Sequence, residues 1–251
     1  MKAGDFSTLA EAYAKYRPDY SAVVLHALDA IVSPKNMADV GAGTGIWTSM
    51  VHSLGVRVSA VEPNDQMRAQ GKEFTKDSEI EWFKGSAEET GLTSGAFDWV
   101  TMASSFHWAD LKRALTEFSR LLVPRGHLTV LWNPRDIDAA PLHQEIEQAL
   151  YSIVPELQRV SSGDKKHVRD YTQELVSTGE FTDALFIEAP HTLTMTRERY
   201  IGAWRSVNDV QQQAGPERFQ QFLNQVEKVL GDSSEVIVPY KTRSWTVRKT
   251  S

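Results

Sequence analysis

The sequence predicts an α/β protein of the doubly wound type, in which helices cover both faces of a mostly parallel sheet. Through about the first 133 of its 251 residues, short runs of β-branched and apolar residues alternate with amphipathic runs of helical length. This alternation is typical of repeated strand–helix units around a parallel sheet. The first short run leads directly into a segment with glycine at every second position, which is typical of a strand–loop–helix unit that holds a nucleotide.

The individual elements follow from this pattern in order along the chain. Two helices, Leu9–Tyr16 and Ser21–Ile31, are expected ahead of the sheet and are separated by Pro18. Five strands are predicted next, at Met37–Val40, Val56–Val61, Ile80–Phe83, Phe97–Met102 and His127–Trp132. The connecting helices are expected at Ile46–Ser53, Asp65–Phe74 and Leu111–Leu122, and the turn Pro124–Gly126 is expected to end the last of them.

The regular alternation stops after Asn133. A polar, mostly helical region without a strong strand pattern extends from Pro134 to about Gly179, which indicates an insertion. Three further segments complete the chain: strand character at Ala184–Met195, a polar helical region at Arg197–Leu230, and a strand or hairpin arm at Glu235–Val247.

Composition and charge exclude several classes of function. The chain has no cysteine, which excludes disulfides, thiolate zinc sites and a cysteine nucleophile. Its formal net charge of -6 argues against broad nucleic-acid binding, because an acidic surface repels a phosphate backbone. No stretch approaches the roughly 18 to 20 consecutive apolar residues of a membrane span, so we expect a cytoplasmic protein without membrane contact. The histidines lack metal-ligand spacing, so no metal is predicted. The expected partner is a small-molecule substrate, and a monomer and a homodimer both stay open.

The strongest local pattern is the glycine-rich segment after the first predicted strand. Asp39 is followed by Gly41, Gly43 and Gly45, so side chains are missing where a ligand must approach the backbone. A nucleotide-like ligand is the expected occupant, although a tight turn that only packs the strand against the helix would give the same pattern. A dinucleotide fits poorly, because its third glycine would fall at Ile46. A phosphate-binding loop is not indicated either, since no Gly-Lys-Ser/Thr sequence is present here.

A second carboxylate, Glu62, ends the second predicted strand. Nucleotide-binding sheets place a carboxylate at this position, where it can accept hydrogen bonds from the two hydroxyls of a ribose. Glu62 therefore supports nucleoside binding without identifying the ligand further. The alternative is an ordinary surface glutamate at a strand end.

The segment Asp39-Val40-Gly41-Ala42-Gly43-Thr44-Gly45 resembles the first motif of class I methyltransferases, which use S-adenosylmethionine and release S-adenosylhomocysteine. The resemblance implies a Rossmann-like, seven-stranded sheet. It also implies that Asp39 helps to position the methionyl ammonium, that the three glycines pass along the cofactor and that Glu62 holds its ribose. Where the family usually has an acidic residue beside the adenine, this chain has Ser86, so the expected contacts are Ser86 and the backbone of Ala87. A helix-capping serine would look the same.

The segment after the fourth predicted strand resembles one particular branch of this family. Its pair His107-Trp108 resembles a branch of class I methyltransferases that includes trans-aconitate-type enzymes. The segment Leu131–Asp136 and the amino-terminal run Phe6–Tyr20 also resemble this branch. This segment is expected at the carboxyl edge of the sheet, where open α/β sheets bind ligands, so Ser104 is an expected cofactor contact and the His-Trp pair is expected to face the transferable methyl group.

Methyl transfer from a sulfonium is an in-line displacement, and alignment of the reactants can supply roughly 7 to 11 kcal/mol of the barrier. Tyr13, a candidate catalytic residue, Tyr16 and Trp108 are candidates for an aromatic wall around the sulfonium, and ordinary core packing is the alternative for each ring. Arg17 is a further expected cofactor contact. His107 is the candidate base if the acceptor is a hydroxyl or an amine. Alternatively, His107 could hydrogen-bond another residue of the site without touching the substrate, or its ring could form part of the wall beside the methyl group. A carboxylate acceptor would need no base.

The candidate substrate residues are Trp108, Arg135 and Trp204. An arginine can grip a carboxylate with two parallel hydrogen bonds, and a tryptophan can line an acceptor pocket. A solvated arginine and a tryptophan in helix packing are the alternatives. Two other functions also stay open, namely an NAD(P)-dependent oxidoreductase and a module that binds S-adenosylmethionine without catalysis.

We expect a single class I methyltransferase domain over residues 1–251. Its expected parts are amino-terminal lid helices at 1–35, a cofactor-binding core at 36–133, a helical cap at 134–183, and a final part at 184–251 that completes the sheet and adds helices.

Overall fold

The computed structural model describes residues 9–159 and 169–250. The beginning of the amino-terminal run, including Phe6, and residues 160–168 of the predicted helical cap lie outside the described residues. The chain divides into two compact units. We call them the core unit, with residues 19–132, 170–189 and 242–251, and the helical unit, with residues 1–18, 133–169 and 190–241. The expectation of a single domain over the whole chain stays a prediction.

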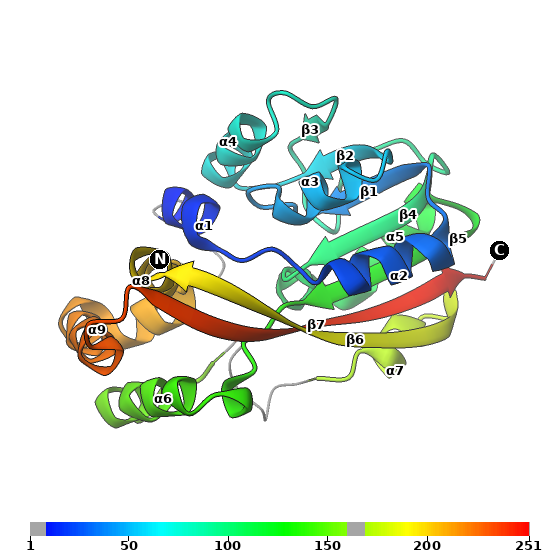
Figure 1. The fold of residues 1–251 in the computed structure, drawn as a ribbon. Helices are drawn as coiled ribbons and strands as arrows, with labels where there is room; N and C mark the ends of the chain where they lie inside the picture. Colours follow the sequence, from blue (N-terminus) through cyan, green and yellow to red (C-terminus); the bar gives the residue numbers. More distant parts are fainter. Residues whose placement is uncertain (1–8, 160–168, 251) are drawn as a thin grey trace. The chain divides into compact units, whose positions relative to one another are not determined.

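Seven strands form one sheet in the order β3-β2-β1-β4-β5-β7-β6, which confirms the predicted seven-stranded, doubly wound fold (Figure 1). The strands are β1 Asn36–Val40, β2 Arg57–Val61, β3 Glu81–Phe83, β4 Phe97–Ala103, β5 Leu122–Trp132, β6 Phe181–Thr196 and β7 Glu235–Lys249. The first five strands pair in parallel, and β7 runs antiparallel to β5. The strand order reverses between β1 and β4, and open α/β sheets bind ligands at the carboxyl ends of strands at such a point.

The predicted bounds of the first four strands are correct to within one residue, but the fifth begins earlier than expected. The strand β5 begins at Leu122 instead of His127, because Leu122 pairs with Phe97 before the register shifts at Trp99. The segment Pro124–Gly126, expected as a turn, is therefore the irregular first part of a strand. A bulge of this kind lets the two strands remain paired on either side of it, although Pro124 has no N–H group to donate to the neighbouring strand.

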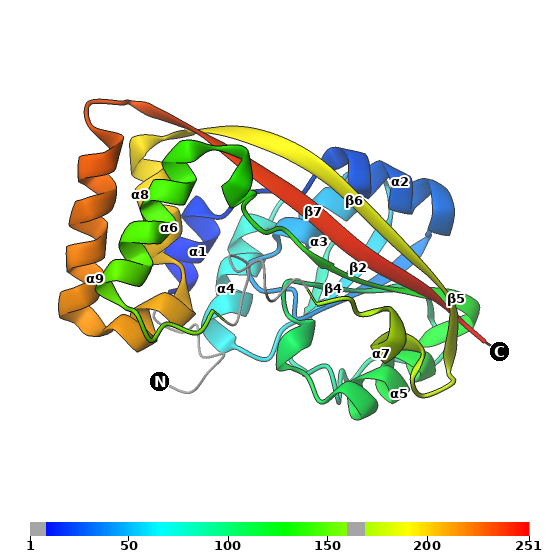
Figure 2. The same ribbon diagram turned by 90° about the horizontal axis from the view of Figure 1, so that it is seen from below.

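Helices cover both faces of the sheet in the core unit (Figures 1 and 2). These helices are α2 Ala22–Val32, α3 Ile46–His52, α4 Asp65–Phe74, α5 Leu111–Leu121 and α7 Thr172–Val176. Neighbouring residues of β4 enter different hydrophobic clusters: Trp99 joins Leu28 of α2 and Trp47 of α3, whereas Val100 joins Phe118 of α5. This alternation is expected of a strand that is buried on both faces.

The helical unit has a core of its own. Its helices are α1 Ala10–Tyr16, α6 Pro141–Ile153, α8 Arg197–Arg205 and α9 Asn208–Leu230, with a short 3-10 turn at Ile137–Ala139. The side chains of Leu150, Trp204 and Phe222 are buried together, and the last two rings meet edge to face at 4.8 Å. Helix α9 is kinked at Gly215, which has a φ of 71° and precedes Pro216. None of the described helices is long and apolar enough to cross a membrane.

Replacing Gly71 of α4 by alanine is expected to destabilise the protein through overpacking. A Cβ atom at this position would lie 2.1 Å from the ring of Trp82 in β3. Overpacking costs about 1 to 3 kcal/mol, whereas alanine gains about 1 kcal/mol over glycine in helix propensity. We therefore expect Gly71→Ala to lower the free energy of unfolding, measured by urea denaturation, by up to about 2 kcal/mol.

The Trp82→Leu background provides the control for this substitution. With the indole removed, Gly71→Ala is expected to be neutral or to stabilise by up to about 1 kcal/mol. If Gly71→Ala lowered the free energy of unfolding equally in the wild type and in Trp82→Leu, the contact with Trp82 would not be the cause.

Candidate functional site

The glycine-rich loop connects the end of β1 to the start of α3 at the point where the strand order reverses. Gly41 has a φ of 67°, and a Cβ atom there would lie 2.6 Å from Oγ of Ser105, which follows β4. Only glycine therefore fits where the loop passes this segment. Gly43 also has a left-handed φ, 59°, but a Cβ atom there would approach only Met67 Cε, at 3.5 Å. The backbone at Gly43 is thus open on the side where a side chain would stand.

Hydrogen bonds from β2 hold the loop in place. The Val61 carbonyl accepts from the amides of Gly41 at 2.8 Å and Ala42 at 3.1 Å. Glu62 adds a further hydrogen bond to the loop: its Oε2 accepts from the Gly43 amide at 2.9 Å. Its Oε1 accepts from the Asn64 amide at 2.8 Å. Burial raises the pKa of Glu62, and these two amides oppose the rise. The predicted ribose carboxylate is thus placed beside the loop, with both oxygens bonded to backbone.

Asp39 lies at the centre of this arrangement and is fully buried. Its Oδ2 accepts from the Thr48 hydroxyl of α3 at 2.6 Å, and its Oδ1 accepts from the Thr101 hydroxyl of β4 at 2.9 Å. Burial raises the pKa of Asp39 to about 7, the two hydroxyls oppose the rise, and the charge of Glu62 adds to it. Asp39 therefore joins β1, α3 and β4. The sequence reasoning missed Thr48 and Thr101, because a threonine within a helix or strand gives no distinct signal of such a contact.

Three of the predicted site residues, Ser104, His107 and Trp108, lie in the segment that follows β4. Ser104 has a left-handed φ of 56°, its Oγ lies 2.9 Å from the Tyr20 hydroxyl, and its amide donates to the Leu131 carbonyl at 2.7 Å. His107 and Trp108 lie in the short 3-10 helix Phe106–Trp108, and Trp108 is 38% exposed. The turn at Ser104 therefore directs the chain so that this pair follows the carboxyl end of β4.

Ser86 and Ala87 lie in a tight turn after β3. The amide of Ser86 donates to the Glu89 carbonyl at 2.9 Å, and the amide of Glu89 donates back to the Ser86 carbonyl at 3.3 Å. Ala87 is buried in the core of the unit. The turn places both residues at the carboxyl edge of the sheet, and their contact with an adenine stays a prediction.

The remaining predicted residues belong to the helical unit. Arg135 and Trp204 come together there, with the guanidinium carbon 4.0 Å from the centre of the indole ring. The guanidinium carbon of Arg17 lies over the ring of Tyr13, 4.6 Å from its centre. The ring of Tyr16 packs on Gly202 of α8, where a Cβ atom would lie 2.4 Å from it. Tyr16 is therefore a packing residue of this unit, and its cofactor contact stays a prediction.

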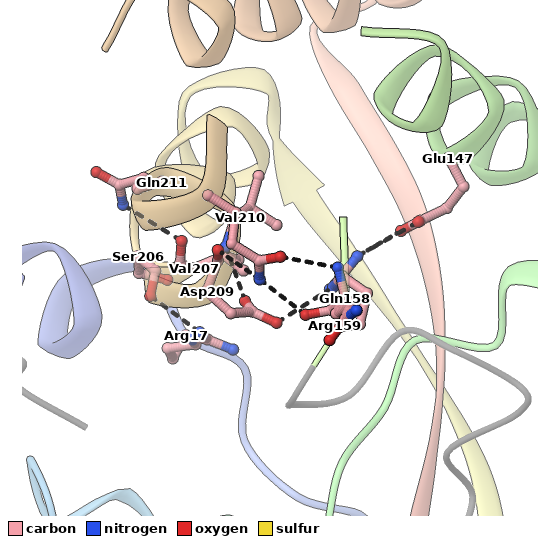
Figure 3. A network of polar contacts seen from close by, with 10 residues as sticks. Arg17, Glu147, Gln158, Arg159, Ser206, Val207, Asp209, Val210 and Gln211 are labelled. Carbon is pink, nitrogen blue, oxygen red and sulfur yellow. Dashed lines mark hydrogen bonds and ion pairs between the residues drawn. The ribbon is translucent and has the colours of Figure 1, made fainter. Parts of the chain in front are cut away.

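A buried ionic cluster also lies in the helical unit (Figure 3). Arg159 pairs with Glu147 of α6 at 3.3 Å and with Asp209 of α9 at 3.5 Å. In the same region, Arg17 donates to the Ser206 carbonyl at 3.0 Å (Figure 3). Burial raises the pKa of Glu147, and the positive charge of Arg159 opposes the rise. Sequence reasoning missed this cluster, because nothing in the local pattern indicates that these charges are buried.

The comparison with known families covers the central part of the core unit. A family model described as a methyltransferase domain matches residues 38–130. These residues form a class I methyltransferase domain. The predicted resemblance is thereby confirmed, and the trans-aconitate-type branch stays a prediction. The methyltransferase domain contains Asp39, the glycine loop, Glu62, the 86–87 turn and the segment 104–108, whereas the predicted residues of the helical unit lie outside it.

Curated relatives support the same family. An uncharacterized methyltransferase of Mycobacterium tuberculosis is 33% identical over 133 residues, which cover 52% of this chain and 53% of the relative. A demethylmenaquinone methyltransferase of Thermus thermophilus is 33% identical over 107 residues, which cover 41% of this chain and 49% of the relative. The chain thus spans about half the length of these two curated relatives.

Solved structures match the fold over most of the chain. A putative type II methyltransferase from Anaeromyxobacter dehalogenans has a TM-score of 0.66 at 16% identity, with 93% of this chain and 98% of that chain covered. A Haemonchus contortus phosphoethanolamine N-methyltransferase, solved with phosphomonomethylethanolamine and S-adenosylhomocysteine, has a TM-score of 0.54 at 14% identity, with 98% and 58% covered. At these identities the likeness concerns the fold alone.

Asp39→Asn is expected to flatten the pH dependence of stability between about pH 4 and pH 7. The pKa of Asp39 is about 7 in the folded protein against an ordinary value of 3.8, so the folded state binds more protons than the unfolded state in this range. The stability that protonated Asp39 contributes is therefore present below 3.8 and is lost as the pH rises to about 7. The slope is at most about 1.4 kcal/mol per pH unit.

Guanidinium denaturation of the wild type and the variant at several pH values across this range measures the effect. The difference in free energy of unfolding should move in favour of the asparagine variant as the pH rises. Parallel curves for the two proteins would contradict the raised pKa.

Proposed function

We propose that the protein is a methyltransferase that transfers the methyl group of S-adenosylmethionine to a small-molecule acceptor. The observation that carries the proposal is the open backbone at Gly43, at the carboxyl end of β1 and within a methyltransferase domain. A ligand can approach the chain there because no side chain stands in the way. The structural relative with bound S-adenosylhomocysteine supports the same cofactor.

The residues of the core unit fit this cofactor in type and position. We propose that the loop 41–45 passes along it and that Glu62, whose carboxylate oxygens each have a further lone pair, accepts from its ribose. Asp39 would act by fixing both ends of the loop, since its oxygens bond to Thr48 and Thr101. When bound, S-adenosylmethionine supplies an electrophilic methyl group that needs alignment more than activation.

The acceptor side of the proposal rests on three residues. Trp108 is exposed beside His107 in the core unit. In the helical unit, Arg135 lies on the ring of Trp204, and among the described residues no carboxylate lies within ion-pair distance of this guanidinium. An arginine stacked on an aromatic face keeps its N–H groups in one plane for a planar anion. In the core unit we propose Trp108 as an acceptor contact and Ser86, Ala87 and Ser104 as cofactor contacts. In the helical unit we propose Arg135 and Trp204 as acceptor contacts, Tyr13 as a catalytic residue, and Tyr16 and Arg17 as cofactor contacts.

Calorimetry with S-adenosylhomocysteine tests the cofactor proposal, and two glycines provide a matched pair of variants. Gly43 and Gly55 both have a left-handed φ, and a Cβ atom would meet no protein atom closer than 3.5 Å at Gly43 and none within 4 Å at Gly55. Both alanine variants therefore carry a similar backbone strain. We expect Gly43→Ala to weaken binding at least tenfold, about 1.4 kcal/mol, and Gly55→Ala to leave it unchanged.

Two outcomes would refute this assignment. One is a wild-type protein that takes up no S-adenosylhomocysteine. The other is an equal affinity in the Gly43 and Gly55 variants, because the loop would then not contact the ligand.

Transfer of an isotope-labelled methyl group from S-adenosylmethionine in metabolite extracts tests the activity. We expect label in low-molecular-weight products with the wild-type protein and at least tenfold less with Gly43→Ala at limiting cofactor. Label in protein or nucleic acid alone would overturn the small-molecule acceptor. Cofactor binding without labelled product in any extract would instead identify a non-catalytic binding module.

A further inference from the structure

His107 lies against a cluster of aromatic side chains in the core unit. The ring of Trp132, at the end of β5, stacks on Tyr171 with centroids 4.3 Å apart and an interplanar angle of 9°. Trp245 of β7 meets both rings edge to face, at 5.8 Å from Trp132 and 5.5 Å from Tyr171. The Trp132 indole is thus fixed from two sides, and the direction of its N–H group is fixed with it.

This N–H group points at one particular nitrogen of His107. The Nε1 atom of Trp132 donates to Nδ1 of His107 at 3.4 Å. An indole nitrogen can only donate, so Nδ1 must present its lone pair. A neutral imidazole carries a single proton, which therefore resides on Nε2.

The protonation pattern decides what His107 can do in a reaction. Because Nε2 already carries a proton, it cannot take another from an acceptor group. Uptake of a proton at Nδ1 would break the bond from Trp132 and leave two N–H groups facing each other. The favourable role for Nε2 is therefore to donate a hydrogen bond.

We propose that Trp132 is a positioning residue that holds His107 in the Nε2–H tautomer, so that His107 orients the methyl acceptor as a hydrogen-bond donor and does not act as its base. The inference rests on the proposed methyltransferase function. A donor role for His107 implies that the methyl acceptor carries a hydrogen-bond-accepting group beside its attacking atom. It also implies that the attacking atom transfers no proton to His107. This role differs from those that the sequence left open for His107, namely a base, an indirect hydrogen bond and a wall beside the methyl group.

Nitrogen NMR of the whole protein with isotope-labelled histidine tests the tautomer directly. The signals of His107 are identified by their loss in His107→Gln, and the spectra are recorded near pH 8, above the ordinary titration range of histidine at about 6.5. We expect the wild type to show a protonated Nε2 and an unprotonated Nδ1. In Trp132→Phe, which keeps a stacked ring but lacks the N–H group, the two signals should move towards a mixture of tautomers.

Trp245→Phe is the matched control. It removes an indole N–H group from the same cluster, but this group donates to Oδ1 of Asp170 at 3.0 Å and not to His107. We expect the His107 signals to stay as in the wild type. A protonated Nδ1 in the wild type, no change in Trp132→Phe, or an equal change in both tryptophan variants would overturn the proposal. These spectra need neither cofactor nor acceptor, so their outcome is separate from the calorimetry that tests the proposed function.

Turnover with labelled methyl donor adds a second readout. Glutamine keeps an N–H donor at the reach of Nε2 but cannot act as a base, whereas phenylalanine has neither property. We expect His107→Gln to retain labelled product within about tenfold of the wild type and His107→Phe to lose substantially more. Loss of a general base typically costs about a hundredfold to ten-thousandfold, so a glutamine variant as inactive as the phenylalanine variant would refute the donor role.

Discussion

The buried carboxylate of Asp39 is the interaction on which the geometry of the proposed site depends. It accepts hydrogen bonds from a threonine of α3 and a threonine of β4, and it is itself a residue of β1. The glycine loop starts two residues after Asp39 and ends where α3 begins, so one side chain fixes both ends of the loop. A buried carboxylate is costly unless its oxygens are hydrogen-bonded, and two hydroxyls meet this requirement while leaving the group easy to neutralise.

Glu62 completes the arrangement at the middle of the loop. Its carboxylate bonds to the amide of Gly43 and to that of Asn64, so it joins the loop to the turn after β2. The backbone that would face a ligand is therefore held from three strands before any ligand arrives. A site organised in this way avoids part of the ordering cost that binding would otherwise carry.

The sequence was sufficient for the fold because its alternating pattern repeats over many residues, whereas the errors fall where a single local contact decides. The start of β5 depends on one pairing between Leu122 and Phe97 across a bulge, and no periodicity reports such a contact. The glycine positions of the site were predictable, since only their residue type matters there. The partners of Asp39 were not, because Thr48 and Thr101 look like ordinary members of a buried helix and strand. Likewise, the contact of Trp132 with His107 joins two segments that only the completed sheet brings together.

Chain connectivity has a consequence for how this protein can be divided. The core unit and the helical unit alternate along the sequence, with changes after residues 18, 132, 169, 189 and 241. Cutting the polypeptide after Trp132 would remove β7, the strand that pairs with β5 at the edge of the parallel part of the sheet. No single cleavage can therefore release either unit intact, and a shortened gene product ending at the family match would lack strands that complete its own sheet.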